Sequence, residues 1–195
     1  MTQILMKALF VKDIMMKNRT IIYALALFWL SAITTNGICL AAEKGPAEKN
    51  AVLGADTLDA LRYIREEVKL ARDLYAALSD VWGLAVFENT AKSKQSLMNA
   101  VSSLMAPYGF DGPTADAGRF VDEDLQELYS YLIDRGKVSR NNAIDVTILI
   151  EQTVIADLND VFLQPNAIDV HKVLTLLMEG SQYHLHEISR YLVIY

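Results

Sequence analysis

Apolar residues recur at intervals of three and four along four long stretches of this chain, and this spacing restricts the fold more than any other feature. The first stretch extends from Leu58 to Leu78, and the others cover residues 89–106, 140–164 and 167–194. Residues three or four apart share one face of an α-helix, whereas a strand needs a period of two, which no segment sustains. We therefore predict an all-α protein with four long amphipathic helices.

Helix-ending residues separate the four stretches. Gly83 follows the first, Pro107 follows the second, and Pro165 divides the third from the fourth. A glycine-rich loop and a shorter helical pattern, residues 123–135, lie between the second and third stretches. The predicted architecture is a four-helix bundle in which a long connection between the second and third long helices carries a short extra helix.

An uncharged apolar segment, Thr20–Thr34, precedes the helical region and follows the basic residues Lys17 and Arg19. This order is typical of a secretory signal, and the segment is shorter than the roughly 20 residues that span a bilayer comfortably. Small residues just before position 42 suit cleavage by a signal peptidase. We therefore expect an N-terminal export signal.

This prediction divides the chain into a signal peptide of residues 1–41, a flexible spacer of residues 42–56 and a helical domain of residues 57–194. Translation that starts at Met15 or Met16 would give the signal a more ordinary length. The mature protein would be periplasmic or extracellular. The alternative is an uncleaved segment that anchors the chain in the inner membrane.

Charge and cysteine content restrict the partners of the mature chain. Residues 1–41 carry four Lys and Arg residues and one Asp, so their removal changes the formal net charge from −6 to −9. Such an acidic chain is a poor ligand for nucleic acid or an anionic membrane, because both need clustered basic residues. The single cysteine, Cys39, lies within the signal, so disulfides do not hold the predicted domain together.

Three ionisable side chains lie on the apolar faces of different predicted helices. They are Glu67, for which the neighbouring Glu66 is an alternative, Glu151 and His184. Taken singly, a surface ion pair or a hydrogen-bonded core histidine explains each of them. All three fall near the middle of their helices, however, and a buried charge needs a partner or a metal. This placement favours a shared interior site.

Several motifs give the chain a family resemblance. They are the run Arg65–Tyr75 (REEVKLARDLY), Trp82–Leu84, Leu125–Tyr129 (LQELY), Ile150-Glu151, and Gly180-Ser181 with His184-Leu185. In this order, over residues 58–192, the sequence resembles the bacterial family called domain of unknown function 2202. The resemblance implies a ferritin-like four-helix bundle, a scaffold that commonly holds a di-metal centre bridged by carboxylates and histidines.

The sequence departs from that family where ligands are expected. Members usually have Ser-Glu-Gln-x-His-Met on the second long helix, and this chain has Lys94 in place of the Glu and Leu97 in place of the His. Val154 stands where an acidic residue is common. The resemblance therefore implies that ligand positions have been lost at Lys94, Leu97 and Val154. The candidate metal ligands that remain are Glu66, Glu67, Glu151 and His184.

Lys94 could supply the positive charge that a metal ion would otherwise provide. Two interior carboxylates without a cation would repel each other and be driven to protonate. We hypothesise that the Lys94 ammonium lies between Glu67 and Glu151 as an internal ion cluster. The alternative is that the aliphatic stem of Lys94 carries its ammonium out to solvent.

Two functions follow from these observations. The first is an exported ferritin-like domain with a degenerate metal site and no catalytic residues, which acts as a binding or structural module. The alternative is an iron or manganese oxidoreductase or a metal-storage protein that uses the retained carboxylates and His184. Helical bundles also self-associate readily, but the sequence does not indicate which face a homo-oligomer would share.

Overall fold

The computed structural model describes residues 53–110, 116–162 and 168–192. This part of the chain contains five α-helices and no strand, which confirms the all-α class. The predicted signal peptide and nearly all of the predicted spacer lie outside the described residues. Among the helices that are described, none has the length and apolar character needed to cross a membrane. The helices are α2 (Ala55–Trp82), α3 (Ala85–Met105), α4 (Glu123–Gly136), α5 (Arg140–Phe162) and α6 (Ile168–Ser189).

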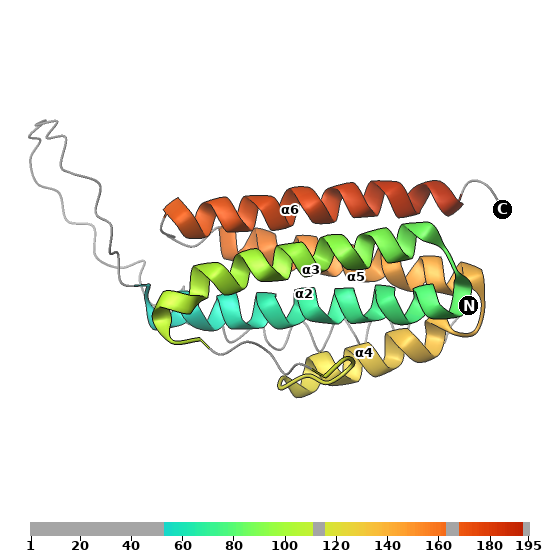
Figure 1. The fold of residues 1–195 in the computed structure, drawn as a ribbon, viewed down its shortest axis with the longest axis horizontal. Coiled ribbons are helices and arrows are strands. Elements are labelled where there is room, and N and C mark those ends of the chain that lie inside the picture. Colours follow the sequence, from blue (N-terminus) through green and yellow to red (C-terminus); the bar gives the residue numbers. More distant parts are fainter. Residues whose placement is uncertain (1–52, 111–115, 163–167, 193–195) are drawn as a thin grey trace, which may run out of the picture. The chain divides into compact units, whose positions relative to one another are not determined.

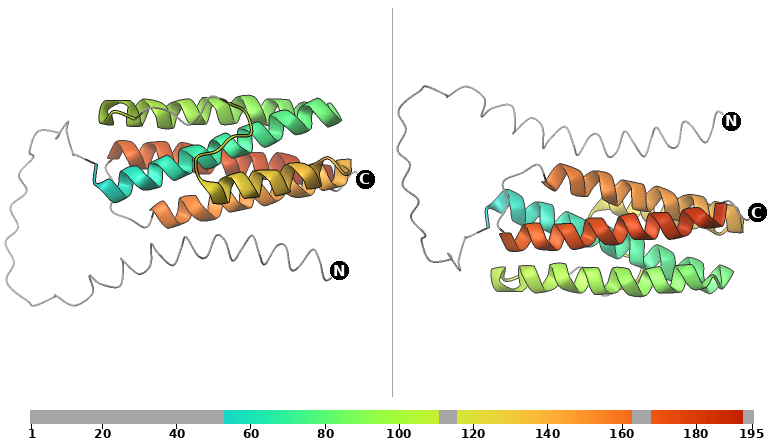
Figure 2. Two further views of the ribbon diagram at one scale, coloured as in Figure 1. Left: turned by 90° about the horizontal axis from the view of Figure 1, so that it is seen from below. Right: turned by 90° about the horizontal axis from the view of Figure 1, so that it is seen from above.

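Four of these helices pack lengthwise around a common core. α2 contacts α3 and α5, and α6 also contacts α3 and α5, so the order around the core is α2, α3, α6, α5. The fifth helix, α4, lies against α2 and α5 on the side away from α6 (Figure 1). The views from above and below in Figure 2 show the same lengthwise packing. α4 is the extra helix predicted in the connection between the second and third long helices.

The helix ends follow from local chemistry. Gly83 ends α2 in the left-handed region with a φ of 61°, and its N–H donates to the carbonyl of Ser79 at 2.8 Å. The side chain of Asp122 caps α4 by accepting a hydrogen bond from the N–H of Leu125 at 3.0 Å. The indole of Trp82 donates to the carbonyl of Gly136 at 2.9 Å, so the end of α2 is joined to the end of α4.

α3 and α6 approach each other closely at Gly180. A Cβ atom added to Gly180 would lie 2.8 Å from Cδ1 of Leu97, which is less than a van der Waals contact. The absence of a side chain at Gly180 is therefore what leaves room for Leu97. Leu97 thus packs between two helices.

Candidate functional site

The Lys94 ammonium is buried in the interior of the bundle. The Lys94 side chain is 0% exposed, and so is that of Glu151. Lys94 Nζ donates to Glu151 Oε2 at 2.7 Å and to Ser181 Oγ at 2.9 Å. The three side chains come from α3, α5 and α6, so one buried ammonium links three helices of the bundle.

His184 extends this group of polar side chains. It is 3% exposed, and its Nδ1 lies 3.6 Å from Glu151 Oε1. Its Nε2 lies 2.9 Å from the Oγ of Ser93 on α3. We call Lys94, Glu151, Ser181 and His184 the interior cluster.

The pKa of Glu151 is lowered within the interior cluster in spite of its burial. Burial by itself would raise the pKa of the Glu151 carboxyl, because an apolar environment disfavours charge. The Lys94 ammonium, together with the nearby His184 ring, outweighs burial and holds the pKa of Glu151 below its ordinary value. The cluster therefore contains an ammonium and a carboxylate in direct contact.

Glu67 is buried near this cluster but is not bonded to it. Its side chain is 0% exposed, and neither of its carboxyl oxygens has a hydrogen-bond partner among the described residues. Burial raises the pKa of Glu67 well above its ordinary value, and the carboxylates of Asp157 and Glu151 add to the increase, while Lys94 opposes it. Glu67 is therefore the more easily protonated of the two buried carboxyls, and the structure pairs Lys94 with Glu151 alone.

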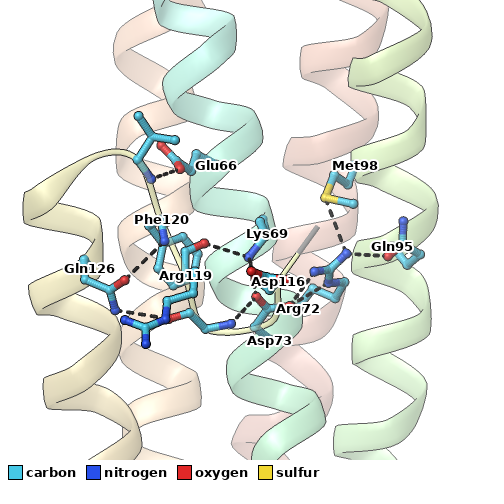
Figure 3. A network of polar contacts seen from close by, with 12 residues as sticks. Glu66, Lys69, Arg72, Asp73, Gln95, Met98, Asp116, Arg119, Phe120 and Gln126 are labelled. Carbon is cyan, nitrogen blue, oxygen red and sulfur yellow. Dashed lines mark hydrogen bonds and ion pairs between the residues drawn. The ribbon is translucent and has the colours of Figure 1, made fainter. Parts of the chain in front are cut away.

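Glu66 lies apart from the interior cluster. Its carboxylate accepts hydrogen bonds from the backbone N–H groups of Val121 and Asp122, the second at 3.2 Å. Figure 3 shows Glu66 on α2 facing the chain that leads into α4. These residues immediately precede α4. Glu66 therefore fastens the entry to α4 onto α2 and does not point to the groups around Lys94.

Lys69 and Asp73 continue this attachment along α2. Lys69 Nζ donates to Asp73 Oδ2 at 2.7 Å and to the carbonyls of Asp116 and Arg119 at 2.8 and 3.0 Å. Asp73 Oδ2 also accepts from the N–H of Gly118 at 2.9 Å. Figure 3 shows these side chains of α2 facing the segment of residues 116–122, which we call the clamped loop.

Arg72 connects the same network to α3. Its Nε and Nη2 atoms donate to Asp73 Oδ1 at 2.8 and 2.6 Å, and its Nη1 donates to Gln95 Oε1 at 2.6 Å. Most of the polar residues in the run Arg65–Tyr75 therefore hold a loop and a neighbouring helix in place. The family resemblance rests in part on this structural network.

The described residues do not fit a di-metal centre. Across the part of the chain that the structure describes, no group of three or more His, Cys, Asp or Glu side chains is arranged to hold a metal ion. Lys94 places a positive charge against Glu151, Val154 is a fully buried apolar residue, and Leu97 packs on Gly180. A cation bound there would have to displace the ammonium of Lys94.

Sequence reasoning missed Ser181 and Ser93. Ser181 accepts a hydrogen bond from Lys94, and Ser93 bonds to His184. One signal for Ser181 was available, because it precedes His184 by three residues, which is the spacing of a Glu-x-x-His pair. A serine on an apolar helix face is common enough to be overlooked without that comparison.

Fold and site together define a class: an all-helical bundle whose interior holds a buried ion pair and a histidine. The chain belongs to the family described as "Uncharacterized protein domain (DUF2202)", whose model matches residues 57–193.

Comparison with known proteins gives a relative in the archaeon Methanocaldococcus jannaschii, so the expectation of a bacterial family is not supported by this relative. The chain is 37% identical to the uncharacterized protein MJ0754 over 131 residues, which are 66% of this chain and 71% of that protein. The crystal structure of hypothetical protein MJ0754 from Methanococcus jannaschii matches with a TM-score of 0.69 and 33% identity. This match covers 78% of the present chain and 85% of the other.

Proposed function

We propose that the protein is an exported ferritin-like domain without catalytic activity, which acts as a binding or structural module and has an ion pair in place of a metal centre. The observation that carries this proposal is the 2.7 Å contact between Lys94 Nζ and Glu151 Oε2, with both side chains fully buried. A buried ammonium in direct contact with a carboxylate balances the charge of that carboxylate without a metal ion.

The positions of the interior residues support the ferritin-like part of the proposal. Di-metal carboxylate bundles use one Glu from each of two helices and a Glu-x-x-His pair from each of the other two. In this chain Glu67 and Glu151 correspond to the single carboxylates, on α2 and α5. The two pairs correspond to Lys94-x-x-Leu97 on α3 and Ser181-x-x-His184 on α6. Glu67, Glu151 and His184 are therefore the three ligands that remain of the six. Lys94 donates hydrogen bonds to the side chains at two ligand positions, Glu151 and Ser181.

Export is the second part of the proposal and rests on the order of residues in 1–41. Basic residues precede an uncharged apolar segment that is short for a membrane span. The intact mass of the protein recovered from its cellular compartment tests this part. A mass that still includes residues 1–41 would replace the exported domain with an N-terminally anchored one.

A metal-dependent oxidoreductase or a metal-storage protein is the second candidate. The observation in its favour is a set of buried polar atoms that have no hydrogen-bond partner among the described residues. They are both carboxyl oxygens of Glu67, Oε1 of Glu151 and Nδ1 of His184. Carboxylate and imidazole groups are ligands for iron and manganese, so these atoms would be the ones that hold such an ion.

Metal loading separates the two candidates. The purified protein is incubated with ferrous iron, manganese or zinc, desalted and analysed for metal content. We expect less than one ion per chain for the parent and a clear gain for the Lys94→Glu/Leu97→His variant, which restores a Glu-x-x-His pair. The parent's retention of two ions per chain, or its oxidation of ferrous iron, would show that the site is functional and the proposal wrong.

A matched control is available on the same helix. The Asn89→Glu/Lys92→His variant creates a Glu-x-x-His pair at two exposed positions of α3 and changes the net charge by the same amount. We expect this control to bind no more metal than the parent. A similar gain in both variants would mean that the pair binds metal without help from Glu67, Glu151 and His184.

A further inference from the structure

The outer face of α6 is unlike the other exposed faces of the bundle. Among the described residues, six large apolar side chains are exposed, and three of them lie on α6. Ile168 is 78% exposed, Leu176 is 51% exposed and Tyr183 is 63% exposed. By contrast, the exposed positions of the adjacent α5 are all polar: Asn141, Asp145, Gln152 and Asn159. The apolar side chains are thus concentrated on one helix.

The three apolar residues form a stripe with two charged ones. Residues 168, 172, 175, 176, 179 and 183 follow one another at helical spacing and therefore share one face of α6. Lys172 and Glu179 lie along the middle of this stripe, and both are exposed. Neither forms an ion pair with another side chain in the described part of the chain. A groove of about 540 Å³ accompanies the stripe and is lined by Ile168, His171, Lys172, Thr175 and Leu176.

We propose that this stripe is a homodimer interface, in which α6 packs antiparallel against α6 of a second copy of the chain. The two-fold axis passes between Thr175 and Leu176. Lys172 then faces Glu179 of the second copy, and Glu179 faces Lys172 of that copy. Ile168 faces the second copy's Tyr183, whose ring lies at the end of the groove, and Leu176 lies beside its own counterpart.

Charge complementarity selects a second copy, in this direction, as the partner. A parallel arrangement in register would bring Lys172 against Lys172 and Glu179 against Glu179, and both contacts are repulsive. A membrane surface is a poorer match, because the stripe carries one basic and one acidic residue instead of a basic cluster. The antiparallel pair satisfies both charges of both copies with two symmetric ion pairs.

The size of the stripe sets the expected affinity. It extends over 15 residue steps, which is about 22 Å of helix. A single helix face of this length is smaller than the roughly 800 Å² per partner of a standard stable interface, so we expect a dissociation constant of about 10–100 μM. This inference concerns the surface and does not depend on the proposed function of the interior.

Charge exchange tests both the face and the direction. Sedimentation equilibrium of the purified protein over about 5–500 μM should show a monomer–dimer equilibrium. Lys172→Glu and Glu179→Lys should each weaken the dimer by at least about tenfold, because each variant places like charges opposite one another. A 1:1 mixture of the two variants should restore dimers, since each charge then faces its opposite. Matched controls at exposed positions on the α4 side, Lys137→Glu and Glu127→Lys, should leave the equilibrium unchanged.

Each other outcome overturns the proposal. A parent protein that stays monomeric at every concentration has no such interface. A monomeric parent that binds vesicles of phosphatidylcholine and phosphatidylglycerol would show that this face contacts a membrane instead of a second copy. If the two single variants dimerise with the same dissociation constant as the parent, the dimer contact lies on another face of the protein. Single variants that dissociate but are not rescued by mixing rule out the antiparallel register. Circular dichroism melting checks that the variants remain folded, as expected for two exposed positions.

Discussion

Replacing Lys94 with methionine removes the ammonium that Glu151 and Ser181 share inside the bundle. Methionine is similar in length and apolar, so the main consequence is electrostatic. In the variant, the fully buried Glu151 loses the ammonium that lies 2.7 Å from its Oε2 atom in the parent. Breaking a buried ion pair by removing one partner costs about 3–5 kcal/mol. Because whole domains are stable by only about 5–15 kcal/mol, we expect a large drop in the free energy of unfolding at pH 7.

The loss should depend on pH with a definite sign. In the parent, the pKa of Glu151 is held below its ordinary value, so the ion pair stabilises the fold above the unfolded-state pKa. This contribution disappears as the pH falls through the lowered, folded-state pKa. In Lys94→Met, burial without the ammonium raises the pKa of Glu151, which can then become neutral as the pH falls. The difference between variant and parent should therefore be largest at high pH and shrink toward acidic pH.

Urea unfolding followed by circular dichroism at pH 5, 7 and 8 measures this difference. Lys92→Met is the matched control, because Lys92 is an exposed lysine on the same helix, and it should have no measurable effect at any pH. The double variant Lys94→Met/Glu151→Leu, which removes both charges, should regain much of the lost stability. A loss below about 1 kcal/mol for Lys94→Met at pH 7, or one that is the same at every pH, would refute the buried ion pair.

Two further substitutions test the buried carboxyl of Glu67 and the clamped loop. Burial and nearby carboxylates raise the pKa of Glu67, so the parent loses stability as the pH rises, whereas a glutamine at this position does not titrate. Relative to the parent, Glu67→Gln should therefore have nearly the same free energy of unfolding at pH 5 and a higher one at pH 8. Urea unfolding measures this, and equal effects at both pH values would contradict it. Gly118→Ala should cost about 1–3 kcal/mol in thermal unfolding, because φ is +72° and the new Cβ would lie 2.9 Å from Tyr129 Cε1. Gly83→Ala, at φ +61° in open space, should cost less, and an equal loss would argue against the contact with Tyr129.

The helices could be predicted because their signal is local. Apolar spacing depends only on neighbours along the chain, and Gly83 and Pro165 mark ends by their own backbone chemistry. The predicted second helix began at residue 89, whereas α3 begins at Ala85, because the apolar link after Gly83 is itself helical. Helical spacing also placed Glu67, Glu151 and His184 on apolar faces, and all three are buried. The interior position of Lys94 was suggested only by the family resemblance, with an ammonium that reaches solvent as the alternative.

The partners of those residues could not be predicted to the same degree. Helical spacing determines which face of a helix a side chain lies on, but not the register between two helices. It therefore could not decide whether Lys94 pairs with Glu151 alone or also with Glu67. Glu66 was the harder case, because its partners are backbone N–H groups in a loop far away in sequence. Backbone donors have no residue type and leave no mark in the sequence.

The clamped loop has a consequence for how the chain can be altered. Loops are usually where proteins accept insertions and new chain ends, because few contacts hold them. Residues 116–122 have no regular secondary structure, yet they are held by Glu66, Lys69 and Asp73, and the last two are only 1% and 4% exposed. Opening this loop would take from the buried Lys69 and Asp73 the hydrogen bonds that they make to the loop backbone. The segment should therefore tolerate insertion as poorly as a helix core, which makes the short link at Gly83-Leu84 the better place to graft a new sequence.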